Sequence, residues 1–309
     1  MAEKAVSAAE FFARFPDELA CLHHIQQTKY GSHTPCPRCG QFGRWTYIRG
    51  TKKFRHTCRK QISTLAGTPF YRSNISLHAV FYAILLFVNS SHGVHSSLLR
   101  KHLGLGTKTA HRLGNLIRMH MASLQPLRKL GNPSDPVAID EVYLRYFRDN
   151  KFDALQPKIL LGLAHCGQVQ CGFIENRTQS ELERAVSHFV HPGSRVMTDQ
   201  WVGYANLRAL GFRHSWVNHS EGTFYRNGVS TVEIDTCWAV FRRSLRLYGQ
   251  IGAGNAWLYL AEMQLRYNFR GRPREAFEFL ISNWPAVDGK AGNALRARFE
   301  WNAQNLALG

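Results

Sequence analysis

Three aspartates stand where carboxylates could hold metal ions. Asp140 lies in an alternating stretch between apolar neighbours, Asp199 closes a short apolar run, and Asp235 lies three residues before a tryptophan in a helical pattern. Phosphoryl transfer without a covalent enzyme intermediate uses two divalent cations, and Mg²⁺ prefers carboxylate oxygens as ligands. One such aspartate alone would more often be a turn or cap residue. The combination of strand, strand and helix predicts a metal site.

Glu233 is a rival for the third acid. The segment from Ser230 to Glu233 fits a capping box, in which the glutamate side chain reaches back to the start of the helix. We therefore assign Asp235 to the metal and Glu233 to the cap. Glu141 follows Asp140 directly, so it should point to the opposite face of the strand, and we expect it to be structural.

A group of cysteines near the N-terminus has metal-ligand spacing. Cys36-Pro-Arg-Cys39 is typical of a zinc knuckle, and Cys58 would supply a third thiolate, but Gln61 stands where a second Cys pair would end. Glutamine is a poor zinc ligand, and structural zinc normally has four N or S ligands. The site is therefore three-coordinate, eroded, or completed by His56 or His33. The other cysteines lack this spacing and are expected to be core thiols.

Residues 95–113 show a helix-turn-helix pattern. Residues 95–102 and 107–113 are helical in character, with a glycine-containing turn between them, and Thr107 is expected to cap the second helix. The side chains expected to meet DNA are Lys108 and Arg112 at phosphates and Thr109 and His111 at base edges.

The distribution of charge favours a nucleic-acid partner. Residues 19–134 contain 17 Lys and Arg and no Asp or Glu, in a chain of net charge +18. A field of one sign repels itself, and a polyanion would relieve that repulsion while releasing its own counterions. We therefore expect double-stranded DNA as the partner of this basic half.

Composition and hydropathy limit the classes of protein to which the chain can belong. The 309 residues are 44% hydrophobic and 12% aromatic, which favours packed cores over disorder. Residues 77–88 are the most apolar run, which is too short to span a bilayer and predicts a buried helix, so no membrane association is expected. Seven cysteines without an export signal indicate a reducing compartment. We expect a cytoplasmic, nucleoid-associated protein, or a nuclear one in a eukaryotic host.

Beyond a linker at residues 131–136, strand and helix patterns alternate. Residues 137–146, 158–165 and 170–176 predict three strands, and further short strands and helices follow, including helices over 201–210, 230–248 and 255–269. This order implies a mixed α/β sheet covered by helices. The predicted parts are an N-terminal helical segment (1–29), a zinc-ribbon-like module (30–72), a helix-turn-helix-like region (73–130), a catalytic domain (131–285) and a C-terminal tail (286–309).

Several of these pieces together resemble one family. The chain is similar to DDE transposases of the bacterial insertion-sequence group with an N-terminal zinc ribbon, a group linked to eukaryotic Merlin elements. The resemblance runs from about residue 35 to residue 269 and is carried by the motifs Ala138-Ile-Asp-Glu-Val-Tyr143, Val196-Met-Thr-Asp-Gln200, Gly203-Tyr204, Val217-Asn-His-Ser-Glu221 and Ile234-Asp-Thr-Cys-Trp238.

The resemblance implies a ribonuclease H-like fold and the roles of particular residues. Asp140 and Asp199 match the first two acids, and Asp235 stands at the third, where the family usually has the longer Glu. Arg242 and Arg243 match a basic position that could touch DNA phosphates, or they form a solvated helix face. His219 matches a motif residue and is either a contact behind the metal site or a simple strand-end histidine.

The function implied is a DNA transposase. It would bind the terminal repeats of its element, cut the end phosphodiester with two Mg²⁺ or Mn²⁺ ions and join the freed 3′-hydroxyl to target DNA. Two DNA ends must be handled together, so a homodimer or a larger synaptic assembly is expected. The alternatives are a catalytically inactive transposase-derived DNA-binding protein and a ribonuclease H-like nuclease that cuts without joining.

Overall fold

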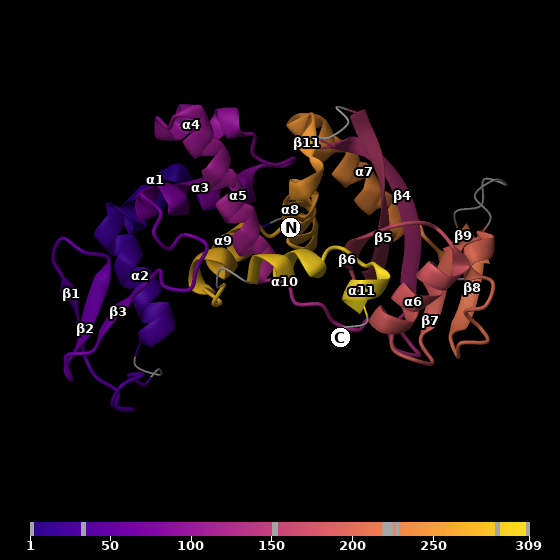
Figure 1. Cartoon of the computed structure of the whole chain (residues 1–309), viewed down its shortest axis with the longest axis horizontal. Helices are drawn as coiled ribbons and strands as arrows, with labels where there is room; N and C mark the ends of the chain where they lie inside the picture. Colours follow the sequence, from indigo (N-terminus) through magenta and orange to yellow (C-terminus); the bar gives the residue numbers. More distant parts are fainter. Residues whose placement is uncertain are drawn as a thin grey trace. The chain divides into compact units, whose positions relative to one another are not determined.

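The chain divides into two compact units. The computed structural model describes residues 3–31, 35–149, 154–217, 225–226, 229–287 and 291–306. The first unit comprises residues 1–124 and 269–292, and the second comprises residues 125–268 and 293–309 (Figure 1). The five-part division predicted from the sequence is finer than these two units and stays a prediction.

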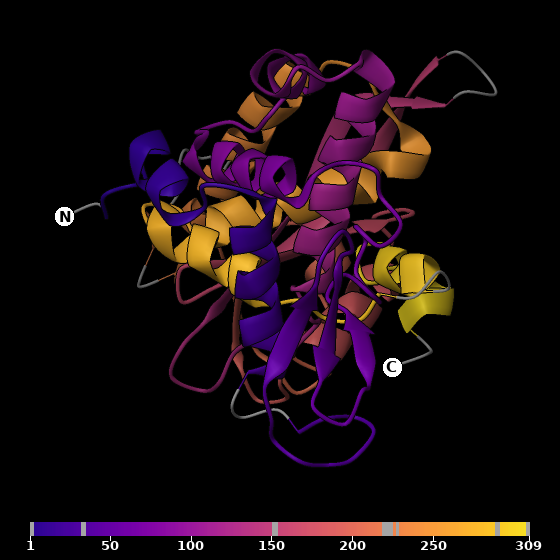
Figure 2. The same cartoon turned by 90° about the vertical axis from the view of Figure 1, so that its left-hand side faces the viewer.

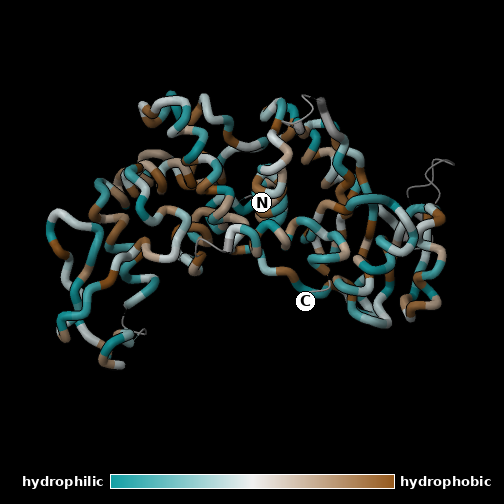
Figure 3. Tube along the Cα trace, in the orientation of Figure 1, coloured by the Kyte–Doolittle hydropathy of each residue, from teal (hydrophilic) through white to brown (hydrophobic). Residues whose placement is uncertain are grey.

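Helices dominate the first unit. They are α1 (Ala8–Arg14), α2 (Glu18–Tyr30), α3 (Leu77–Asn89), α4 (Ser96–Leu103), α5 (Thr107–Ser123) and α9 (Pro273–Ser282). Side-chain oxygens of Ser7, Asp17 and Ser76 accept hydrogen bonds from the first turns of α1, α2 and α3 and so define where these helices begin. The prediction of a buried helix over residues 77–88 is confirmed, and its hydrophobic run is visible along α3 in Figure 3.

The core of the first unit is aromatic. Trp284, which follows α9, stacks on Phe81 of α3 and on His120 of α5. His120 also bonds through Nε2 to the backbone oxygen of Leu280, at 2.9 Å. Burial lowers the pKa of His120 to about 4, so the imidazole is neutral in this core. These contacts hold the segment after residue 268 in the first unit.

A small antiparallel sheet follows α2 in the chain. Its strands are β1 (Trp45–Ile48), β2 (Lys53–His56) and β3 (Gln61–Ser63), in the order β1-β2-β3. Figure 2 shows this sheet beside α2. Phe54 of β2 is fully buried, and its ring lies 5.1 Å from that of His23 on α2. Phe54 is thus one of the side chains that pack the sheet against the helix.

Helices α4 and α5 form the hairpin predicted from the sequence. Gly104 ends α4 in the left-handed region (φ 62°), a conformation that glycine adopts without strain. The prediction that Thr107 caps α5 is wrong, because Gly106 occupies the cap position and Thr107 is the first helical residue. The capping residue therefore supplies no side-chain hydrogen bond to the start of α5.

The second unit is built on a six-stranded mixed sheet. The strands are β4 (Val137–Asp149), β5 (Ala154–His165), β6 (Gln168–Ile174), β7 (Arg195–Asp199), β8 (Arg213–Val217) and β11 (Ile251–Gly252). Their order is β6-β5-β4-β7-β8, with β11 paired to β4. The pairs β6-β5 and β5-β4 are antiparallel, whereas β4-β7 and β7-β8 are parallel. A short pair, β9 (Tyr225–Arg226) and β10 (Val229–Ser230), precedes the next helix.

Helices cover both faces of this sheet. One face packs against α6 (Gln179–Phe189), the turn η1 (Val202–Tyr204) and α11 (Ala303–Leu306), and the other faces α7 (Val232–Tyr248) and α8 (Ala256–Asn268). The remaining elements are η3 (Ala253–Asn255) and α10 (Ala291–Ala297). This arrangement confirms the predicted ribonuclease H-like mixed sheet with flanking helices.

Two glycines let tryptophans approach the sheet closely. A Cβ at Gly162 of β5 would lie 2.5 Å from Trp238 of α7, and one at Gly172 of β6 would collide with Trp301. Trp301, in the segment predicted as a C-terminal tail, is fully buried, and its backbone N–H bonds to Phe173. The end of the chain thus contributes to the core of the second unit.

The helix predicted over residues 201–210 is wrong. Only η1 forms there, followed by turns, with i→i+3 bonds from Tyr204 to Trp201 and from Leu207 to Tyr204. Tyr204 and Leu207 are both fully buried. A 3₁₀ turn has three residues per turn and places residues three apart on the same side, so burying this pair favours the tighter turn.

Among the helices of the described residues, none is both long and apolar enough to cross a membrane.

Candidate functional site

Asp140 and Asp199 are brought side by side by the register of two parallel strands. Ala138 of β4 pairs with Met197 of β7. Each aspartate comes two residues after its member of this pair, and side chains two apart point to the same face of a strand. The two carboxylates therefore leave the same face of the sheet where β7 ends.

Asp235 joins them from the first turn of α7, three residues before Trp238. The indole Nε1 of Trp238 donates a hydrogen bond to Asp140 Oδ2, at 2.8 Å. Asp140 and Asp235 line one cleft of about 410 Å³, together with Trp238 and Arg242. The sequence-predicted acids of β4 and α7 thus share a cleft, with a basic side chain at its wall.

Burial and the neighbouring acids both raise the pKa of Asp140 in the cleft. Burial raises the pKa of Asp140 from 3.8 to about 7, and the Trp238 hydrogen bond opposes this shift. The nearby negative charges of Glu141, Asp235 and Asp199 raise it further. Such a carboxylate has its charge stabilised when a cation binds beside it.

The acids suit hard divalent cations. One oxygen of each already accepts a hydrogen bond: Asp140 from Trp238, Asp199 from the Trp201 N–H, and Asp235 from the Thr231 hydroxyl. Within the part of the chain that the structure describes, each keeps a second oxygen to offer a metal. The ligand atoms of the three acids are not all within 4.8 Å of one another in the described residues. The three acids would hold divalent cations that neutralise charge at a phosphodiester.

The capping box predicted for Glu233 does not form. Helix α7 begins at Val232 after Thr231, and Ser230 Oγ accepts a bond from the Val232 N–H instead. Glu233 Oε1 is buried without a hydrogen-bond partner among the described residues. The Thr231 hydroxyl bonds Asp235, four residues on. The helix start thus orients Asp235 and gives Glu233 no capping role.

Glu141 faces away from Asp140, as strand alternation predicts, into a network that the sequence did not reveal. Its Oε1 bonds Arg177, at 2.6 Å to Nε, and its Oε2 accepts from the Tyr204 hydroxyl, at 2.5 Å. Burial raises the pKa of the Glu141 carboxyl, while both partners favour its charge. Gly203-Tyr204 was visible as a motif, but only the fold pairs Tyr204 with Glu141.

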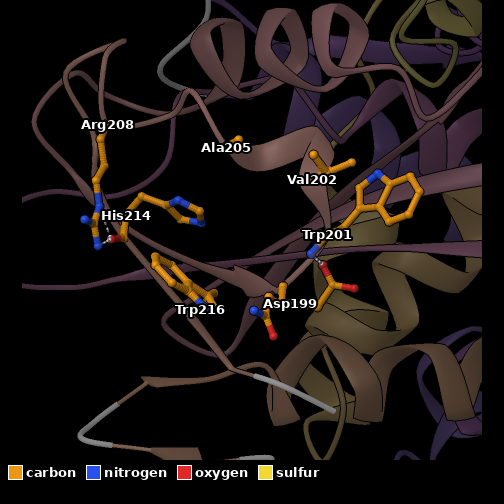
Figure 4. Close-up of a pocket in the computed structure, with 8 residues that line it drawn as sticks. Asp199, Trp201, Val202, Ala205, Arg208, His214 and Trp216 are labelled. Atoms are coloured by element: carbon orange, nitrogen blue, oxygen red, sulfur yellow. Dashed lines mark hydrogen bonds between the residues drawn. The ribbon is translucent and has the colours of Figure 1, made fainter. Parts of the chain in front are cut away.

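Arg177 of this pair also contacts an aromatic pocket beside Asp199. Arg177 lies over the ring of Trp201, with its guanidinium carbon 4.3 Å from the ring centroid. Figure 4 shows the pocket, which has a volume of about 300 Å³. Its lining residues are Asp199, Gln200, Trp201, Val202, Ala205, Arg208, His214 and Trp216. Sequence reasoning missed this pocket.

The cysteine module forms a compact set of metal ligands. Ligand atoms of Cys36, Cys39, His56 and Cys58 all lie within 4.8 Å of one another. The Sγ atoms of Cys36 and Cys58 are 3.6 Å apart, and His56 Nδ1 is 3.2 Å from Cys58 Sγ. A tetrahedron with Zn–S bonds of about 2.3 Å has edges of about 3.8 Å, so this donor set fits zinc. Of the two candidate histidines, the structure brings His56 to the cysteines, whereas His33 lies outside the described residues.

The described residues expected to contact DNA are exposed, on α5 in the first unit and on α7 in the second. Lys108, Thr109, His111 and Arg112 of α5 all face solvent, while Ala110 and Leu113 between them are buried. Arg242 and Arg243 of α7 are also exposed, and Arg242 lines the cleft of the acids. His219 lies outside the described residues.

The fold and the cleft together define a ribonuclease H-like domain with clustered acids. Residues 133–268 match the family model of the ISXO2-like transposase domain. This match confirms, over residues 133–268, the resemblance to DDE transposases recognised in the motifs. No curated protein matches the chain.

Proposed function

We propose that this protein is a DNA transposase that cuts and joins DNA at the cleft between β4 and α7, next to Asp199 at the end of β7. The observation that carries the proposal is the register of β4 and β7, which aligns Asp140 with Asp199 inside a transposase domain. Asp235 and Arg242 complete the cleft. Together these residues offer three carboxylates for cations and a guanidinium for a phosphate.

Asp140, Asp199 and Asp235 would hold two Mg²⁺ or Mn²⁺ ions, which would supply charge neutralisation at the reacting phosphodiester. Trp238 fixes the orientation of the Asp140 carboxylate through its indole N–H. Thr231 does the same for Asp235. Positioning and charge neutralisation are the main contributions of a protein to such in-line displacements, and these bonds supply the positioning.

The first unit would bind the terminal repeats of the element. Its hairpin of α4 and α5 presents Lys108 and Arg112 to phosphates, with Thr109 and His111 exposed beside them for base edges. Target DNA would meet Arg242 and Arg243 near the cleft. Because two ends must be cut and joined together, a homodimer or larger assembly is proposed.

Zinc would stabilise the small sheet of the first unit through Cys36, Cys39, His56 and Cys58. Two of these ligands belong to the knuckle before β1, His56 ends β2, and Cys58 lies in the turn that follows. An ion would therefore tie the loop to the hairpin. Structural zinc sites of this kind contribute directly to folding free energy.

The test is cleavage and strand transfer on DNA carrying the segments that flank the gene, with Mg²⁺ or Mn²⁺. The unaltered protein is compared with Asp140→Ala and Asp235→Ala. We expect joined product from the unaltered protein and none from either variant, with binding to the ends preserved in all three.

The rival functions give different results. Binding to the ends without cleavage by the unaltered protein would identify a non-catalytic DNA-binding protein. Cleavage without any joined strand would identify a ribonuclease H-like nuclease. Joined product from the Asp140→Ala variant would show that the cleft is not the catalytic site.

A further inference from the structure

The aromatic pocket at the end of β7 is distinct from the cleft of Asp140 and Asp235, but it shares Asp199 with the candidate metal site. Asp199 ends β7 and lines the pocket, while its Oδ1 accepts the backbone N–H of Trp201 at 3.0 Å. Thr198 pairs with Trp216 of β8, so Trp216 points to the face of the sheet opposite Asp140. The pocket therefore begins at a candidate catalytic acid and extends away from the acid cluster.

Two tryptophans of this pocket are unusually exposed for their size. The exposed fractions are 40% for Trp201 and 44% for Trp216. Tryptophan is normally highly buried, and large exposed aromatic surface marks sites of interaction. In the view of Figure 4, the two side chains lie on either side of Asp199.

Each of the two tryptophans that line the pocket packs against an arginine. Arg177, which stacks on Trp201, is held by the buried carboxylate of Glu141, at 2.5 Å. Arg208 lies 5.3 Å from the ring centroid of Trp216 and donates two hydrogen bonds to the backbone oxygen of His214, at 3.1 and 3.0 Å. The indoles are thus packed against fixed cations, which favours a pre-formed surface over mobile side chains.

The chemistry of the lining fits a flat, polar-edged ring. Indole faces stack on any nucleobase, and the side-chain amide of the exposed Gln200 could reach the edge of such a ring. A volume of about 300 Å³ lies at the lower end for small-ligand sites. It suits one base rather than a duplex.

We propose, on the basis of the function proposed above, that this pocket receives a single unpaired DNA base next to the phosphodiester that is cut. A base can reach an aromatic pocket only after it leaves the duplex stack, and stacking on indole offsets the energy of unstacking. Because the pocket starts at Asp199, a base held there keeps its own phosphate near the acids. The pocket would thereby position the strand that is cut.

The test uses duplexes made from the segments that flank the gene, either fully paired or with one unpaired 2-aminopurine near the cut end. Binding is followed by the fluorescence of 2-aminopurine, which stacking on an indole quenches, and by competition with the paired duplex. We expect the unaltered protein to quench the probe and to prefer the unpaired duplex. Trp216→Ala should weaken that preference about tenfold or more, whereas Trp216→Phe should retain most of it.

Two further variants serve as controls. Tyr71→Ala removes an aromatic side chain of similar exposure (46%) in the first unit and should leave the preference unchanged. Asp140→Asn should keep the preference while losing cleavage, because the pocket does not use that carboxylate.

The possible failures are distinguishable. If the unaltered protein cuts DNA but Trp216→Ala shows an unchanged preference and unchanged quenching, the base pocket is overturned and the transposase proposal stands. If the unaltered protein binds neither duplex, both proposals are overturned.

Discussion

The two candidate metal centres differ in how far they are assembled before an ion binds. In the first unit, Cys36, Cys39, His56 and Cys58 already place all their ligand atoms within 4.8 Å of one another. In the second unit, each aspartate accepts a hydrogen bond from a different residue, and the negative charges of its neighbours raise the pKa of Asp140.

The difference follows from the chemistry of the ligands. Thiols and a neutral imidazole can approach one another without strong repulsion, and a closed four-ligand set leaves no position for a substrate. Carboxylates repel, and a catalytic site must keep room for DNA and for two cations. The first arrangement suits a structural ion, and the second suits reaction at a phosphodiester.

The largest expected effect comes from removing the charge of Asp140. Asp140→Asn should lower cleavage by about 10³-fold or more, because a ligand of the catalytic cations loses its charge. In the metal-free protein the same change should raise the free energy of unfolding by about 1–2 kcal/mol at pH 8, since the ionised carboxylate is buried. Single-turnover cleavage and urea unfolding measure the two effects.

The pH dependence sharpens this prediction. Burial raises the pKa of the folded carboxyl to about 7, above its usual 3.8. The penalty for the ionised form is therefore complete above pH 7 and disappears as the pH falls towards 4. The stability difference between Asp140→Asn and the unaltered protein should vanish near pH 4. A difference that is independent of pH would contradict the account.

The zinc site should show the next largest effect, on stability rather than on chemistry. His56→Ala should lose zinc and destabilise the first unit by several kcal/mol, because three ligands leave the ion poorly held. Gln61→Ala is the matched control, since Gln61 is exposed on β3, where it pairs with Arg55. Metal content by atomic absorption and thermal unfolding decide between them; zinc retained in His56→Ala would show that the fourth ligand is another residue.

A smaller effect is expected at Trp238. Trp238→Phe keeps an aromatic side chain but removes the hydrogen bond to Asp140 Oδ2, together with the end of the indole that packs on Gly162. Groups that orient a metal ligand contribute about 10–100-fold to activity, so cleavage should fall by this factor. A tenfold rise in the Mg²⁺ concentration that gives half-maximal rate would support a positioning role. An unchanged rate would show that the bond is dispensable.

The smallest effect concerns the basic hairpin. Lys108→Ala should weaken binding to the flanking DNA by a few-fold at low salt and should reduce the slope of log affinity against log salt by about one. Filter binding over a range of salt concentrations measures both quantities. An unchanged slope would place the DNA on another surface of the first unit.

The sequence predicted the elements well where a local pattern decides them. Alternation around Asp140 and the apolar run before Asp199 depend on each strand alone, and the structure has both strands. The pairing of β7 with β8 depends on residues far apart in the chain, so the pocket of Trp201 and Trp216 could not be foreseen.

The sequence alone could not decide which histidine completes the zinc site or which residue caps α7, because both depend on the fold. Spacing alone left His56 and His33 equivalent, and only the hairpin of β2 and β3 brings His56 to the cysteines. Ser230 and Glu233 fit the capping pattern, but α7 starts one residue later than that pattern requires, and Thr231 pairs with Asp235 instead.

The most direct test of the central claim is strand transfer by single-turnover assay with the matched pair Asp235→Asn and Glu233→Gln, on the DNA segments that flank the gene. We expect joined product from the unaltered protein and from Glu233→Gln, and none from Asp235→Asn at equal DNA binding. Joined product from Asp235→Asn, together with its loss in Glu233→Gln, would contradict the assignment of the third carboxylate. No joined product from an unaltered protein that binds the ends would contradict the transposase itself.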